Sequence, residues 1–81
     1  MIERSHNKIR ILVAEGFELV RMGLRALFEN HSSVLLVAET NSIEGLFKLA
    51  IQHIPDVILI DLQLSGDDYA EHISKLLHVC P

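Results

Sequence analysis

Short apolar runs alternate along this chain with longer segments in which apolar residues repeat at helical spacing. Three of the runs, Ile9–Ala14, Val34–Glu39 and Val57–Ile60, have the length and the β-branched content of strands. Runs that are apolar almost throughout are typical of parallel strands buried on both faces. We therefore expect three strands in a parallel sheet.

The segment from Glu18 to Asn30 predicts a helix with a wide apolar face. One stripe follows the spacing i, i+3, i+4, i+7 and i+8: Leu19, Met22, Gly23, Ala26 and Leu27. A second stripe lies beside the first: Val20, Leu24 and Phe28. Because this face is wider than a helix lying on a sheet needs, we expect the helix to have a further packing partner. Without that partner the second stripe would be bare.

Two further helices are predicted. Asn41 followed by Glu44 resembles a capping box at the start of the second helix. Its apolar repeat runs to Pro55, which ends the helix. The third helix is predicted over Tyr69–Val79, and the residues between it and the last strand form a loop. Its apolar side comprises Ala70, Ile73, Leu77 and Cys80.

The predicted order is βαβαβα, which indicates the α/β class with a doubly wound parallel sheet. In a sheet of order 2-1-3, the first and third strands are neighbours. Residues 1–8 are polar and form a lead-in, and residues 9–81 form one unit without repeats or linkers.

Composition narrows the function classes. The 81 residues include 49% apolar residues and carry a net charge of −4, which argues for a globular chain and against a nucleic-acid-binding surface. No apolar run has the length of a membrane span. The single cysteine, Cys80, cannot form an internal disulfide, and no secretory signal is present. We expect a soluble cytoplasmic protein.

Two carboxylates are the best candidates for chemistry. Glu15 and Asp61 each follow a predicted strand, and ligands of open α/β sheets bind at this carboxyl edge. On strands about 5 Å apart, the two charges would repel by roughly 3 kcal/mol at an effective dielectric near 20. Mg²⁺ would relieve that repulsion, since it is often held by one or two carboxylates with waters and a phosphate. Spacing alone fits equally well with two acids that merely cap strand ends in solvent.

Two motifs resemble a known family. Ile9–Leu24, which reads IRILVAEGFELVRMGL, resembles the start of response-regulator receiver domains joined to LuxR/NarL-type helix-turn-helix domains, where the pattern runs near V-D-D-H-E-L-V-R-x-G-L. Pro55–Gly66, which reads PDVILIDLQLSG, resembles that family's P-D-V-V-L-M-D-L-x-M-P-G. The resemblance covers nearly all of residues 9–81 and implies a flavodoxin-like sheet.

The resemblance also implies a phosphorylation switch in a two-component system. Asp61 matches the aspartate that accepts a phosphoryl group from a sensor histidine kinase. Glu15 matches the first of two acids that bind Mg²⁺, and the backbone carbonyl of Gln63 matches a further ligand. Such a domain is a signalling module, not an enzyme in the usual sense, and controls an output such as LuxR-type transcription regulation.

The chain departs from the family pattern at three residues and in its length. Gly16 replaces the second acid, which should weaken Mg²⁺ binding, Glu15 stands where Asp is usual, and Ser65 replaces a proline. The family's fourth and fifth strands have no counterpart, so Val57–Ile60 would be an exposed edge that invites pairing with another chain. The alternative function is therefore a degenerate, phosphorylation-independent receiver that acts in protein interaction or as a homodimer. An aspartyl phosphatase of the D-x-D-x-T kind lacks its second aspartate here.

Overall fold

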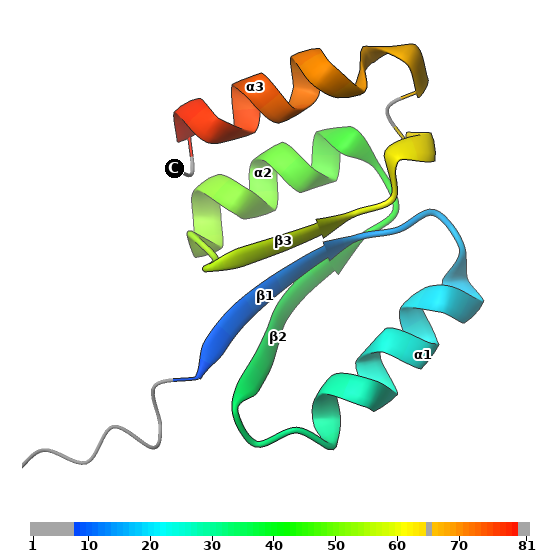
Figure 1. Cartoon of the computed structure of the whole chain (residues 1–81), viewed down its shortest axis with the longest axis vertical. Helices are drawn as coiled ribbons and strands as arrows, with labels where there is room; N and C mark the ends of the chain where they lie inside the picture. The colour runs from blue at the N-terminus through cyan, green and yellow to red at the C-terminus, as the bar shows by residue number, and fades with distance from the viewer. Residues whose placement is uncertain (1–7, 65, 80–81) are drawn as a thin grey trace, which may run out of the picture.

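Strand β1 (Ile9–Ala14) lies at the centre of the sheet because its side chains are apolar on both faces. From Ile11 to Ala14 every residue is buried. The computed structural model describes residues 8–64 and 66–79, and in these β1 pairs in parallel with β2 (Val34–Thr40) on one side and β3 (Val57–Ile60) on the other (Figure 1). The predicted strand order 2-1-3 is confirmed.

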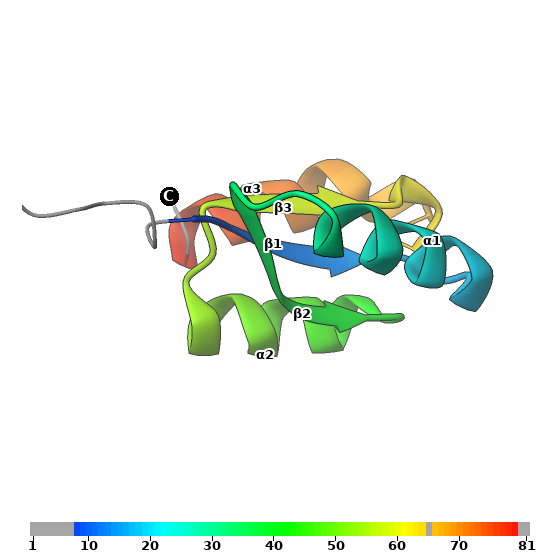
Figure 2. The same ribbon diagram turned by 90° about the horizontal axis from the view of Figure 1, so that it is seen from below.

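Three helices flank this sheet: α1 (Glu18–Glu29), α2 (Ile43–His53) and α3 (Tyr69–Val79). Figure 2 shows α1 and α2 on opposite faces of the sheet, and α3 packs beside α2. Between β3 and α3 the chain forms two 3₁₀ turns, Leu62–Leu64 and Gly66–Asp68, where the sequence predicted a loop. The structure is an open α/β sheet of the flavodoxin-like kind, as predicted.

The two edges of the sheet differ. The pairing of β2 with β1 shifts by one residue, because Ile11 faces Leu36 whereas Leu12 faces Ala38. Val37 is therefore the extra residue of a β-bulge, a device that twists an edge strand and blunts further pairing. The pairing of β3 with β1 is regular, from Ile11 with Val57 onward.

The main core lies between the sheet and helices α2 and α3. Side chains alternate between the faces of a strand, so Leu12 and Ala14 of β1 point to the same side. They pack with Leu46 and Ala50 of α2 and Leu76 of α3, and all five are at most 5% exposed. This cluster fixes the two helices on one face.

Helix α1 presents a different face to the sheet from the predicted one. Its first stripe is exposed, with Leu19 at 79% and Leu27 at 51%, whereas Leu24 and Phe28 of the second stripe are half-buried. The prediction that the second stripe would be bare is wrong for these two residues. Arg21 and Arg25, which share their face at spacing i, i+3, i+4 and i+7, pair with an acid on β2 and turn this face inward.

The third helix also buries a different face from the predicted one. Ile73 and Leu77 are exposed, and Leu76 is the buried residue of α3. His72, one turn earlier, packs edge-on against Phe47 of α2 with ring centroids 6.1 Å apart. The helix therefore contacts α2 through its His72–Leu76 side, not through the predicted stripe.

The ends of α2 show two local features. Ser42, not Asn41 as predicted, is its N-cap, since the Ser42 hydroxyl accepts a hydrogen bond of 3.0 Å from the Gly45 N–H. At its C-terminus Ile54 adopts a left-handed conformation with φ 47°. The Arg10 guanidinium stabilises this turn by donating to the Ile54 and His53 carbonyls, at 3.0 and 2.7 Å.

Gly45 lies where the start of α2 approaches the end of β2 closely. A Cβ at this position would overlap the Thr40 hydroxyl, so the approach requires glycine. Within residues 8–64 and 66–79, no helix has the length and apolarity needed to cross a membrane. The predicted lead-in, apart from Lys8, lies outside the described residues, as do Ser65 and Cys80.

Candidate functional site

Glu15 directly follows β1, and its main chain is held on both sides. Its N–H donates to the Thr40 carbonyl at the end of β2, at 3.0 Å. Its carbonyl accepts a hydrogen bond of 2.8 Å from the Arg21 guanidinium of α1. The Glu15 carboxylate turns back to accept the Phe17 N–H through Oε2, at 3.1 Å. Glu15 is thus bound to three different segments.

Asp61 directly follows β3 and is held in a comparable way. Its N–H donates to the Ala14 carbonyl of β1 at 2.8 Å, which fixes it beside the end of the central strand. Its carboxylate Oδ1 accepts the Gln63 N–H at 3.0 Å, and its carbonyl accepts the Leu64 N–H at 3.0 Å. This turn fixes the carboxylate, since a side-chain bond to the backbone two residues on restrains both.

The two acidic residues line one pocket. Glu15 and Asp61 line a small open cavity of about 180 Å³ at the carboxyl edge of the sheet. Its remaining lining is apolar: Val13, Ala14, Leu24, Leu59 and Ile60. The structure therefore brings together the two acids that the sequence singled out. Gln63 does not line the cavity, and its part in the site is the hydrogen bond to Asp61.

Gly16 lies next to this pocket and contributes no carboxylate. A Cβ at Gly16 would be 3.1 Å from Cδ2 of Leu64, so Leu64 already occupies the space beside its α-carbon. Among the residues that the structure describes, no group of three or more His, Cys, Asp or Glu side chains could hold a metal ion. The acidic site is thus a pair of carboxylates.

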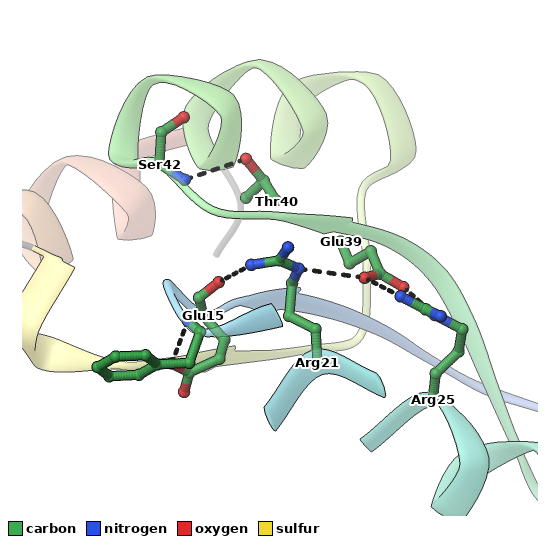
Figure 3. Close-up of polar contacts among 7 residues, drawn as sticks. Glu15, Arg21, Arg25, Glu39, Thr40 and Ser42 are labelled. Atoms are coloured by element: carbon green, nitrogen blue, oxygen red, sulfur yellow. Dashed lines mark hydrogen bonds and ion pairs between the residues drawn. The ribbon is translucent and has the colours of Figure 1, made fainter. Parts of the chain in front are cut away.

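A network of charged residues lies beside this pair (Figure 3). Glu39 of β2 accepts two hydrogen bonds from Arg25, at 2.7 and 2.8 Å, and lies 3.4 Å from Nε of Arg21. The hydrogen bonds from Arg25, aided by the positive charges of both arginines, lower the pKa of Glu39 below its usual 4.5 despite partial burial. Arg21, which also bonds to the Glu15 carbonyl, connects this network to the acid pocket.

Sequence reasoning missed Arg21, Glu39 and Leu64. A weak signal was available, because Arg21 and Arg25 interrupt the apolar pattern of the first helix and Glu39 interrupts the second strand. Opposite charges on neighbouring elements indicate an ion pair, but the pattern does not say which face of the helix turns inward. The contact of Leu64 with Gly16 has no sequence signal.

A larger hollow of about 820 Å³ lies elsewhere, along β2 and the C-terminal end of α1. Neither Glu15 nor Asp61 lines it. Its charged residues include Arg25 and Glu39, which already pair with each other. The acid pocket remains the better candidate for chemistry.

Comparisons with known proteins find response regulators. The chain is 38% identical over 68 residues to the transcriptional regulatory protein LiaR of Bacillus subtilis, covering 84% of this chain and 32% of that protein. It is 33% identical over 73 residues to the response regulator GacA of Pseudomonas viridiflava, covering 90% of this chain and 34% of that protein. A nitrate/nitrite response regulator protein homolog of Haemophilus influenzae is 32% identical over 60 residues, or 74% of this chain and 29% of that protein.

No family model matches the chain. The chain spans about a third of the length of these curated relatives. The parallel sheet of order 2-1-3 agrees with the flavodoxin-like fold of a receiver domain. The chain belongs to the receiver domains of two-component response regulators, of the LuxR/NarL kind.

Proposed function

We propose that this chain is a phosphoryl-accepting receiver in which Asp61 takes a phosphoryl group from the phosphohistidine of a sensor histidine kinase. The observation that carries the proposal is the shared pocket of Glu15 and Asp61 at the carboxyl edge of β1 and β3. Asp61 acts once per signal, as an acceptor and not as a catalyst of turnover. The phosphorylated domain then controls an output such as transcription.

The acceptor atom follows from the hydrogen bonds of Asp61. Oδ1 accepts the Gln63 N–H, whereas Oδ2 has no hydrogen-bond partner among the described residues. Oδ2 is therefore the nucleophile. A bond forms between Oδ2 and phosphorus as the P–N bond to the kinase imidazole breaks, and the released imidazole nitrogen takes up a proton.

The residues present fit a partly hydrated Mg²⁺, which requires oxygen ligands and is often held by only one or two carboxylates. Glu15 and Asp61 would supply carboxylate oxygens, and Gln63 its backbone carbonyl. Bound Mg²⁺ would neutralise the phosphoryl oxygens. Because Gly16 adds no third carboxylate, we expect the affinity to be weaker than in a site with three acids.

Intact-mass measurement after incubation with acetyl phosphate and MgCl₂ tests the proposal. We expect the parent chain to gain one phosphoryl group, and the Asp61→Asn variant to gain none. Asp67→Asn is the matched control, since it removes a carboxylate that follows the same strand but does not line the pocket. Failure of a folded parent chain to gain mass would overturn the proposal.

The proposed setting is the cytoplasm, where a reducing environment suits a chain with one cysteine. We propose no direct nucleic-acid binding by this segment, because it has 11 acidic and only 7 basic residues.

The second candidate is a phosphorylation-independent interaction module that forms homodimers through β3. Two observations favour it: Gly16 adds no carboxylate and has the Leu64 side chain beside it, and the edge strand β3 leaves Val57 and Leu59 about 40% exposed. Exposed apolar strands at a sheet edge invite pairing with another chain. Sedimentation velocity distinguishes the candidates: a dimer that Leu59→Lys dissociates supports the module, and a monomer at all concentrations contradicts it.

A further inference from the structure

Arg21 is the residue that joins the acid pocket to the ion pairs of β2. Its side chain is only 14% exposed, and its guanidinium contacts two segments that are far apart in sequence. One nitrogen donates to the Glu15 carbonyl at 2.8 Å, and Nε lies 3.4 Å from the Glu39 carboxylate. Figure 3 shows Arg21 between these two partners.

The chemistry of arginine suits this position. A guanidinium has donors fixed in one plane, so a single side chain can hold a carbonyl on one side and a carboxylate on the other. An ammonium group is a point charge on a flexible stem and does not offer that fixed geometry. The two contacts therefore require the planar guanidinium of Arg21, and a positive charge alone would not provide them.

The hydrogen bond from Arg21 restrains the main chain of Glu15. The Glu15 N–H is tied to Thr40, so the Arg21 bond to the carbonyl restrains the other side of the residue. Because both main-chain groups of Glu15 are held, its side chain extends from a fixed backbone. Its carboxylate Oε2 accepts a hydrogen bond from the Phe17 N–H. Loss of the Arg21 bond would leave a part-buried carbonyl unsatisfied and free the peptide to rotate.

Arg25 provides the comparison within the same helix. It makes the shorter hydrogen bonds with Glu39, yet it makes no hydrogen bond or ion pair with Glu15. Its side chain is 44% exposed, three times the value for Arg21. Removing either arginine weakens the network on Glu39, but of the two only Arg21 bonds to Glu15, which lines the acid pocket.

We infer that Arg21 is a positioning residue for the acid pocket, which holds Glu15, just after β1, by linking it to Glu39 of β2. This inference rests on the proposed function of Glu15 and Asp61. Residues that hydrogen-bond to a metal ligand and orient it affect the affinity of the site for the metal. Their loss typically weakens metal binding tenfold or more.

The test compares Arg21→Gln with Arg25→Gln by NMR. In an MgCl₂ titration followed by the Gly16 and Gln63 amide shifts, we expect Arg21→Gln to weaken Mg²⁺ affinity about tenfold. Arg25→Gln should change it by less than about threefold, since it breaks only the pairing with Glu39. Equal effects of the two variants would overturn the inference.

A second readout does not depend on Mg²⁺. Hydrogen exchange at the Phe17 amide reports its bond to the Glu15 carboxylate, and we expect faster exchange in Arg21→Gln but not in Arg25→Gln. If Arg21→Gln does not fold, Arg21→Lys replaces it, with the same expectation. Failure of the parent chain to respond to Mg²⁺ would count against the proposed function, whereas unchanged Phe17 exchange would overturn the role of Arg21.

Discussion

Leu64 lies against the α-carbon of Gly16, so that a Cβ on Gly16 would be 3.1 Å from Leu64 Cδ2. Gly16 directly follows Glu15, which lines the pocket together with Asp61. Gly16 and Leu64 lie far apart in sequence, and the turn after Asp61 brings them together. Gly16 thus lacks a carboxylate, and the side chain beside it, Leu64, is apolar.

This contact predicts how a third carboxylate can be restored. We expect Gly16→Asp with Leu64→Ala to bind Mg²⁺ about tenfold more tightly than the parent chain, a gain of about 1.4 kcal/mol. Gly16→Asp alone should gain less, because Leu64 must move by a few tenths of an ångström. NMR titration with MgCl₂ measures both. Gly16→Ala with Leu64→Ala is the control, and an affinity equal to that of the Asp variant would contradict the prediction.

The identity of the α2 cap predicts a contrast between adjacent residues. Ser42→Ala removes the acceptor of the Gly45 N–H and should lower the free energy of unfolding by about 1 kcal/mol. Asn41→Ala should change it by less than about 0.5 kcal/mol, since Asn41 is exposed and does not cap the helix. Urea denaturation measures both values. A larger loss of unfolding free energy from Asn41→Ala than from Ser42→Ala would support the capping box predicted from the sequence and contradict this prediction.

The left-handed turn at Ile54 predicts a stabilising substitution. A β-branched residue with φ 47° is strained, and glycine adopts this conformation without a Cβ clash. Because Ile54 is 65% exposed, Ile54→Gly loses little burial and should raise the free energy of unfolding by about 1 kcal/mol.

Ile51→Gly is the matched control for this change. Ile51 is also exposed but lies within α2, where glycine should lower stability by about 1 kcal/mol. Thermal unfolding of the two variants checks the opposite signs. A loss of stability in both would show that the turn at Ile54 is not strained.

The Glu39 network predicts a pH dependence of stability. Hydrogen bonds from Arg25 lower the pKa of Glu39 in the folded chain below its usual 4.5. The unfolded chain therefore takes up this proton first, and the contribution of Glu39 is complete above pH 4.5 and is lost as the pH falls through the folded pKa. Glu39→Gln should lower the melting temperature near neutral pH.

The difference in melting temperature between parent and Glu39→Gln should shrink as the pH falls to about 3. Both melting curves, followed by circular dichroism, give this comparison. Glu44→Gln is the control, because Glu44 is an exposed acid of α2 outside this network. A difference that does not vary with pH would show that the Glu39 carboxylate adds no stability through its charge.

The sequence by itself determined the order of elements and the position of the acids. Strand length, apolar runs and helical repeats are local properties, so the three strands and three helices lie within a residue or two of their predicted bounds. The placement of Glu15 and Asp61 at one edge follows from the parallel order, since such strands end at the same side of a sheet.

Tertiary structure alone decided which faces turn inward. The sheet-facing side of α1 depends on Glu39, which lies 14 residues beyond Arg25 and is brought to it only by the pairing of β2 with β1. The choice of Ser42 over Asn41 as the cap depends on the path of the chain after Thr40. Periodicity defines the faces of a helix, but partners distant in sequence select among them, because burial and ion pairing depend on the whole fold.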